Sequence, residues 1–349
     1  MVSFSSRPST DSTRAIVITS IQKPTPQVYE FLDQPGWSTI FVADLKTPAF
    51  PPPAGMDLLS VEAQRRDFGA LAARLPWRHY ARKNLGYIKA MRDGATVIFD
   101  TDDDNAPVAP WTPRPLDDIA AAPTHRARWI NAYAYFGAEQ VWPRGYPLEE
   151  IGACVAPTTM PADSSTVKVW QGLVEGDPDV DAVFRLTRPD GVRFHDRAPL
   201  VLPAGSYCPF NSQNTWWSRE AFAYLYLPAT VTFRFTDILR SLVAQRCFWA
   251  HGWQLGFQHV TAIQQRNAHN LLADFEDELP CYLLPAKIVR KLDALALNND
   301  PAHNLRACYA ALADEKWVGA GEIELVDAWL NALPVSAATS ARHDSLATR

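Results

Sequence analysis

Short apolar runs alternate with helical patterns in the first third of the chain. The runs at residues 15–19, 38–43 and 96–99 are rich in β-branched and aromatic side chains, and they predict buried strands. Between the last two runs, apolar residues recur at helical spacing over 60–74 and 85–91, which predicts two helices. Alternating strands and helices are typical of a parallel sheet covered by helices, so we expect an α/β fold. The polar residues that follow each strand should then meet at one edge of the sheet, where such folds bind ligands.

The rest of the chain has a less regular pattern. Prolines interrupt residues 106–165, which predicts ordered loops with short strands. Several strand-like segments follow, and they end in a helix predicted from Asp237 to Gly252. Residues 267–333 have the pattern of helical segments separated by prolines. The organisation expected from these patterns is a disordered start at 1–13, an α/β domain at 14–260, a helical extension at 261–333 and a disordered tail at 334–349.

Composition and charge narrow the class of protein. Of the 349 residues, 47% are hydrophobic, which is enough for a sizeable core. The formal net charge is -5 and no long Lys/Arg block occurs, which argues against nucleic-acid binding. The five cysteines are widely spaced and form no Cys-x-x-Cys pair, a pattern that favours a reducing compartment. No segment has the features of a secretory signal or the roughly 20 apolar residues of a membrane span, so we expect a cytoplasmic protein.

An acidic run follows the third predicted strand directly, with the sequence Asp100-Thr101-Asp102-Asp103-Asp104-Asn105. Four like charges this close repel one another, and a bound divalent cation would remove that cost. Carboxylate oxygens are hard ligands, which favours Mg²⁺ or Mn²⁺ bridging the protein to substrate phosphates. Alternating positions can face one ion, either Asp102 with Asp104 or Asp100 with Asp102. The other interpretation of the run is a solvated acidic turn.

Polar residues also follow the first two predicted strands. Thr19 and Ser20 end the first strand, and Asp44 and Lys46 follow the second. In a parallel sheet these residues would converge with the acidic run, where Asp44 could bind a ribose or a base. Taken alone, Asp44 could equally be an ordinary loop acid.

Two basic residues, Arg82 and Lys83, precede the helix predicted at 85–91. Cations near a helix N-terminus oppose the helix dipole unless an anion binds there. A diphosphate would meet that requirement, so the pair predicts a diphosphate site next to the acidic run. The alternative is a basic surface turn.

A second acidic loop and three histidines complete the candidates. The loop Gly176–Asp181 could supply a general base or hold acceptor hydroxyls, although Pro178 also suits an ordinary turn. His251, His259 and His269 lie at the end of the predicted 237–252 helix and beyond it. One of them, His251 in the first instance, could ligate the metal or contact a phosphate. A lone histidine is more often structural.

A set of segments carries a family resemblance: residues 18–25, 42–48, 76–77, 82–87, 98–105, 170–182 and 237–246. In this order along the chain, they resemble the STELLO-like glycosyltransferase family, which is distantly similar to the reversibly glycosylated polypeptides (UDP-arabinopyranose mutases). The resemblance implies a GT-A-type nucleotide-sugar-binding sandwich over 14–260, with a mostly parallel central sheet and an added C-terminal helical region. It also implies Mn²⁺ or Mg²⁺ on the donor diphosphate.

The resemblance assigns roles residue by residue. Asp102, Asp103 and Asp104 match the metal motif; Asp102 and Asp104 are the expected metal pair, and Asp100 and Asp103 lie beside them in the nucleotide-sugar site. Thr19, Ser20 and Asp44 fall where such folds contact the nucleotide, and Arg82 and Lys83 match the basic pair near the diphosphate. Asp179 and Asp181 match a second acidic motif. An inverting enzyme would use one of this last pair as the base, whereas a retaining enzyme would need none there.

The implied function is a metal-dependent glycosyltransferase that moves a sugar from a nucleoside-diphosphate sugar, UDP-linked, to a glycan or glycolipid acceptor. Plant STELLO proteins carry membrane anchors, and this chain shows none, so we expect a bacterial-type cytosolic enzyme with at most peripheral membrane association. Two alternatives stay open. One is a mutase that interconverts pyranose and furanose forms of a UDP-sugar. The other is a non-catalytic scaffold in polysaccharide assembly.

Overall fold

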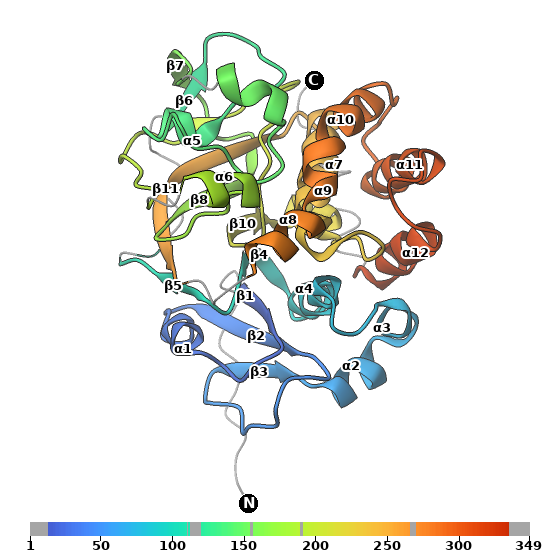
Figure 1. Cartoon of the computed structure of the whole chain (residues 1–349). Helices are drawn as coiled ribbons and strands as arrows, with labels where there is room; N and C mark the ends of the chain where they lie inside the picture. The colour runs from blue at the N-terminus through green and yellow to red at the C-terminus, as the bar shows by residue number, and fades with distance from the viewer. Residues whose placement is uncertain are drawn as a thin grey trace, which may run out of the picture.

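The computed structural model describes residues 13–109, 111, 120–153, 156–188, 191–265 and 270–334. These residues form an 11-stranded sheet in the order β3-β2-β1-β4-β10-β8-β11-β9-β6-β7, with β5 paired to β11 (Figure 1). The strands are β1 (Thr13–Ser20), β2 (Trp37–Ala43), β3 (Met56–Leu59), β4 (Ala95–Thr101), β5 (Asn105–Pro107), β6 (Ala120–Pro123), β7 (Thr159–Ala162), β8 (Val167–Glu175), β9 (Leu200–Val201), β10 (Asn214–Ser218) and β11 (Gln254–Gln264).

Helices lie on both faces of the sheet and beside it (Figure 1). The α-helices are α1 (Pro26–Leu32), α2 (Val61–Asp67), α3 (Gly69–Arg74), α4 (Lys83–Arg92), α5 (Ala132–Tyr135), α6 (Ala182–Thr187), α7 (Thr236–Ala250), α8 (Leu271–Asp277), α9 (Leu279–Leu283), α10 (Pro285–Asp293), α11 (Pro301–Asp314) and α12 (Glu322–Ala332). Short 3-10 helices are η1 (Tyr80–Arg82), η2 (Leu148–Ala153), η3 (Arg219–Leu225) and η4 (Phe233–Phe235).

The first part of the chain is the parallel part of the sheet. Strands β3, β2, β1 and β4 pair in parallel, with Ile18 opposite Phe41 and Ile16 opposite Phe99. The α/β fold and the three strands expected here are therefore confirmed. Beyond β4 the sheet is mixed, because β10 runs antiparallel to both β4 and β8. The carboxyl ends of β1, β2 and β4 consequently share one edge.

Helix α4 packs unusually close to the parallel strands. A Cβ built on Gly86 would lie 2.6 Å from methyl carbons of both Val17 and Val42, so only glycine allows this approach. The helix begins at Lys83, two residues before the apolar pattern that predicted it. The segment 60–74 differs from the single helix expected, because Phe68, with a φ of -119°, lies between α2 and α3, and Gly69 begins α3 with a φ of 44°.

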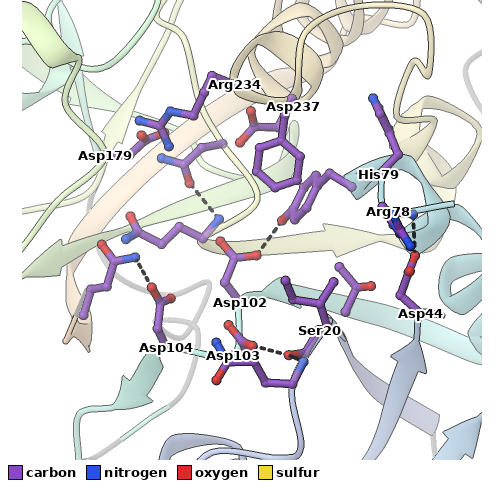
Figure 2. Close-up of a pocket in the computed structure, with 18 of the residues that line it drawn as sticks. Ser20, Asp44, Arg78, His79, Asp102, Asp103, Asp104, Asp179, Arg234 and Asp237 are labelled. Carbon is purple, nitrogen blue, oxygen red and sulfur yellow. Dashed lines mark hydrogen bonds between the residues drawn. The ribbon is translucent and has the colours of Figure 1, made fainter. Parts of the chain in front are cut away.

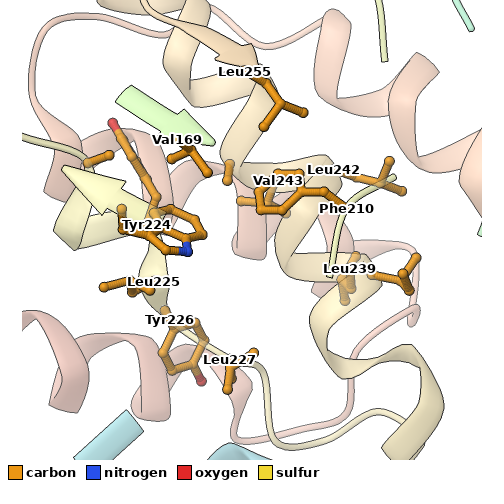
Figure 3. Close-up of a cluster of buried hydrophobic side chains, with 14 of the residues drawn as sticks. Val169, Phe210, Tyr224, Leu225, Tyr226, Leu227, Leu239, Leu242, Val243 and Leu255 are labelled. Atoms are coloured by element: carbon orange, nitrogen blue, oxygen red, sulfur yellow. The ribbon is translucent and has the colours of Figure 1, made fainter. Parts of the chain in front are cut away.

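The helical region at the C-terminal end shares its core with the sheet. Val169 of β8, Leu242 of α7 and Trp329 of α12 belong to one cluster of buried apolar side chains, part of which is drawn in Figure 3. Helix α7 fits the helix predicted from Asp237 to Gly252, and α8–α12 fit the predicted helical segments. Thr13 begins β1, while residues 1–12 and 335–349, for which disorder was predicted, lie outside the described residues. In the part of the chain that the structure describes, no helix has both the length and the apolar character that crossing a bilayer requires.

Candidate functional site

A polar cavity of about 420 Å³ opens at the carboxyl ends of the parallel strands (Figure 2). One side is formed by Ser20 after β1, Asp44 after β2 and Asp102, Asp103 and Asp104 after β4; we call these residues the strand-end wall. The opposite side comes from loops and from the start of α7. Its members, which we call the arginine wall, are Arg144, Asp179, Arg234 and Asp237. A cavity of this size suits a ligand as large as a nucleotide.

The acidic run is divided between the core and the cavity. Asp100 still belongs to β4 and is fully buried. Its carboxylate forms ion pairs with Lys83 at 2.6 Å and with Arg240 at 2.9 Å. Two cations therefore neutralise Asp100 inside the protein, and the carboxylates that line the cavity are those of the following three aspartates.

Asp102 is held in place by groups from the start of α4 and from η1. Its Oδ1 accepts a hydrogen bond of 2.5 Å from the Tyr80 hydroxyl and lies 3.4 Å from the Lys83 ammonium. Burial and the negative charge of Asp104 raise the pKa of Asp102 to about 7, against the opposing effect of Lys83. Lys83, which Asp102 shares with Asp100, therefore does not offset the burial of this carboxyl group.

Asp103 and Asp104 connect the acidic run to neighbouring elements. The Ser20 hydroxyl donates to the Asp103 carboxylate, and the Thr25 hydroxyl donates to the Asp103 carbonyl. Gln264, the last residue of β11, donates to the Asp104 carboxylate at 2.9 Å. These bonds fix the loop after β4, so the direction of its carboxylates is set before any ligand binds.

The donor set of the strand-end wall fits a hard divalent cation in part. Asp102 and Asp104 supply only oxygen, the ligand type that Mg²⁺ and Mn²⁺ prefer, and their mutual repulsion would be relieved by such an ion. Among the described residues, however, no three His, Cys, Asp or Glu side chains form a ready-made cage. The carboxylates would thus hold an ion together with oxygens from a substrate, which is how Mg²⁺ is commonly bound.

Asp44 is positioned by an unusual backbone conformation. Arg78 has a φ of 58°, which is costly for a residue with a side chain, and its backbone N–H donates to Asp44 Oδ2 at 2.8 Å. Asp44 is 5% exposed, and its other oxygen, Oδ1, is buried without a hydrogen-bond partner in the structure. A buried carboxylate oxygen without a donor is costly, so this atom is suited to an N–H or O–H group of a ligand.

The arginine wall is a closed ion network. Arg144 donates to both oxygens of Asp179, at 2.7 and 2.8 Å, and to both oxygens of Asp237, at 3.1 Å each. Asp237 also accepts from the backbone N–H of Ser212 at 3.2 Å. Arg234 is held separately by Glu278 at 2.6 Å. Fork-shaped arginine contacts of this kind fix carboxylates firmly.

Comparisons with known proteins relate the chain to a family. Residues 234–337 match the family model described as STELLO glycosyltransferases. Over 257 residues, 68% of the chain, it is 31% identical to "Probable glycosyltransferase STELLO2" of Arabidopsis thaliana. Over 267 residues, 71% of the chain, it is 30% identical to "Probable glycosyltransferase STELLO1" of the same plant. The chain is STELLO-like. It spans about a third of the length of these relatives, 34% and 35% respectively.

Arg82 and Lys83 of this STELLO-like chain do not line the cavity, unlike the basic pair expected there. Arg82 is 1% exposed, and its guanidinium lies 3.4 Å above the Trp77 ring and donates to Gln64 at 2.8 Å. Burial lowers its pKa to about 10. Lys83 is fully buried and reaches the site only through its contacts with Asp100 and Asp102. The two cations are part of the core that supports the acidic run.

His251 and Asp181 also lie apart from the cavity. His251 follows α7, where its ring stacks on Trp253 at 4.2 Å and its Nε2 lies 2.6 Å from the Tyr224 hydroxyl. Burial lowers the pKa of His251 to about 4. Asp181 is fully buried at the N-cap of α6, where it accepts from Phe184 N–H. His259 lies in β11 and does not line the cavity, and His269 lies outside the described residues.

The other predicted residues lie together. Thr19, Ser20, Asp44 and Lys46 line the cavity with Asp102–Asp104 and Asp179. Sequence reasoning did not single out Arg78, Arg144, Arg234 or Asp237 for this cavity, although all four line it. Arg144 stands in a proline-rich loop outside the segments that carry the family resemblance, whereas Asp237 begins the segment 237–246 but was given no role in a site. Their place in the site is recognised only from the ion pair that Arg144 and Asp237 form in the folded chain.

Proposed function

We propose that this chain is a metal-dependent glycosyltransferase of GT-A type, which moves a sugar from a UDP-linked donor to a glycan or glycolipid acceptor. The observation that carries the proposal is the cavity itself: an acidic strand-end wall faces a rigid arginine wall across a space of about 420 Å³. The names of the Arabidopsis relatives support the reaction class. The shared length is about a third of each relative, so the donor and the acceptor are argued from the residues.

The nucleoside end of the donor is assigned to Asp44 and its neighbours. The buried Asp44 Oδ1 lacks a donor, and a base N–H or a ribose hydroxyl would supply one. Thr19 and Ser20 end the adjacent strand and line the same part of the cavity. A ligand that cannot donate a hydrogen bond there would leave this oxygen unpaired, so Asp44 would also discriminate between nucleosides.

The diphosphate is assigned to the space between the acidic run and two exposed cations. Lys46 and Arg78 line the cavity, and neither has an ion pair among the interactions of the described residues. Asp102 and Asp104 would hold Mg²⁺ or Mn²⁺ on the diphosphate, and the ion would stabilise the negative charge of the leaving group. Tyr80 and Lys83 keep the Asp102 carboxylate oriented toward that position.

The acceptor is assigned to the arginine wall, with Asp179 as the candidate base of an inverting reaction. Arg144 fixes Asp179 in one orientation, and each carboxylate oxygen keeps a further lone pair that can accept a hydroxyl proton. Asp181 is enclosed in the α6 cap, which makes Asp179 the better of the two predicted acids.

The proposal is tested by incubating the chain with UDP-sugars and Mn²⁺ and following UDP release. Release or transfer should require both the metal and the donor, and UDP should bind in calorimetry. Absence of turnover with every nucleotide-sugar, together with absence of nucleotide binding, would disprove the proposal. Product chromatography without an acceptor distinguishes a transferase from a mutase, because only a mutase converts the UDP-sugar alone.

A further inference from the structure

Helices α8 and α9 expose a line of large apolar side chains. Leu272, Phe275, Leu279 and Leu283 are 70%, 36%, 41% and 62% exposed. Their separations of three, four and four residues place them on one face of a helix. The residue between the helices, Glu278, keeps helical backbone angles, so the face continues from α8 to α9. We call these four residues the α8–α9 stripe.

The opposite face of these helices is polar and buried, which reverses the usual arrangement. Glu278 is fully buried, and its carboxylate accepts from Arg234 at 2.6 Å, from the Tyr282 hydroxyl at 2.6 Å and from the backbone N–H of Ala182 at 2.7 Å. These charge-assisted bonds fix the rotation of the helices about their axes. The hydrogen bonds of Glu278 thus hold the stripe toward solvent. Exposing four large apolar side chains to water is unfavourable, which indicates a binding surface.

The stripe is connected to the candidate site through η4. The Thr232 hydroxyl donates to the carbonyl of Asp277 in α8 at 2.6 Å, and Arg234 binds Glu278. Between them stands Phe233, which is 51% exposed and lines the cavity beside Tyr80, with ring centroids 5.5 Å apart. An exposed aromatic ring thus stands at the cavity wall, on the short helix η4 to which α8 and α9 are anchored.

The charges beside the stripe favour one kind of occupant. Residues 271–283 contain no lysine or arginine, and the acidic residues exposed in this segment are Glu276 and Asp277. Helices that bind anionic membranes present Lys and Arg around their apolar face, so a lipid surface is disfavoured. A single line of exposed side chains, on helices anchored to the cavity wall through Arg234, instead fits one extended apolar chain.

We propose that the α8–α9 stripe binds the apolar chain of an amphipathic acceptor, whose sugar end enters the cavity past Phe233. This inference rests on the proposed function, since it names the class of acceptor as a lipid-linked sugar. Leu272 and Leu283 lie outside the cavity and are mostly exposed, so they can be changed without disturbing the core.

The test compares two probes, octyl and methyl β-D-glucoside, titrated into the chain in the presence of UDP and below the micelle concentration. The octyl probe should bind at least about tenfold more tightly, because each buried methylene adds to affinity. The Leu272→Gln/Leu283→Gln double variant should lose most of this difference and keep UDP binding. Met160→Gln, which alters a 55% exposed side chain of β7, should behave as the unmodified chain.

Other outcomes would overturn the inference. The octyl and methyl probes could bind equally well, or the double variant could keep the full difference. Alternatively, the substitutions could abolish a dimer or the binding of phosphatidylcholine vesicles and leave the octyl preference intact, which would assign the stripe to a second copy or to a bilayer. Failure of the proposed function is recognised separately, because UDP binding would then be absent in all three proteins.

Discussion

Both walls of the cavity contain aspartates, but the two walls differ in how far neighbouring cations balance the negative charge. The arginine wall is complete in itself, because Arg144 pairs with both Asp179 and Asp237. The strand-end wall leaves negative charge unbalanced, since burial and Asp104 both raise the pKa of Asp102. A wall neutralised from within provides rigidity, whereas the carboxylates of the other wall would be neutralised further by the cation proposed to bind them. The predictions below probe this difference.

The largest effect is expected from Arg144→Met. The substitution leaves Asp179 and Asp237 buried without their partner, and loss of one member of a buried pair costs about 3–5 kcal/mol. Urea denaturation should show this loss, and Arg144→Lys should recover part of it. Arg66→Met alters an arginine that is 72% exposed and should be nearly neutral. If the two methionine variants are equally stable, the arginine wall is not a structural network.

The Asp102→Asn/Asp104→Asn double variant should behave in the opposite way. It removes like charges and keeps an acceptor oxygen for Tyr80, so the denaturation midpoint should stay the same or rise. UDP release with Mn²⁺ should fall by about 100-fold or more, because the ion loses its carboxylate ligands. The control is Asp33→Asn, an exposed acid after α1. Full activity in the double variant would contradict the contrast between the walls.

His251, expected as a metal ligand, belongs to neither wall and permits a test by pH. Its folded pKa, about 4, is below the ordinary histidine pKa of 6.5, so the unfolded chain binds more protons between these values. His251 therefore favours folding fully above pH 6.5, and this contribution is lost as pH falls toward 4. Thermal melting of the unmodified chain should drop more between pH 7 and pH 4.5 than that of His251→Gln. A melting temperature that depends on Mn²⁺ through His251 would instead support ligation.

The smallest effect is expected at Arg78, whose backbone holds Asp44. Because the φ of 58° is strained for any side chain, Arg78→Ala should be less stable than Arg78→Gly by on the order of 1 kcal/mol. Both variants should raise the KM for the UDP-sugar, and Arg78→Lys should restore most of the affinity by charge. An unchanged KM in Arg78→Ala would show that the Arg78 side chain does not contribute to binding the UDP-sugar.

A feature of this molecule can be predicted from the sequence when residues close together along the chain determine it. The strands β1, β2 and β4 and the residues after them are set by local apolar patterns, so their meeting at one edge could be anticipated. Local pattern does not say whether a charge is neutralised inside the fold. Arg82 and Lys83 stand at the start of a helix, but both are buried in the core, where Arg82 bonds to Gln64 and Lys83 pairs with Asp100.

The arginine wall could not be predicted from the local sequence pattern. Arg144 and Asp237 are 93 residues apart, and Arg144 and Asp179 are 35 apart. No periodicity connects residues at such separations, because their meeting depends on how β10 and α7 pack against the parallel strands. The split between α2 and α3 has a more local cause, since Phe68 leaves helical backbone angles and the following Gly69 has a positive φ.

The charge balance of the site depends on the close packing of α4 against the sheet at Gly86. Any side chain at this position would push α4 away from β1 and β2, because its Cβ would meet Val17 and Val42 at 2.6 Å. The ammonium of Lys83, on the first turn of the same helix, would move with it and away from Asp100 and Asp102. The charge balance of the acidic run therefore depends on Gly86 having no methyl group, although this residue carries no charge and belongs to neither wall.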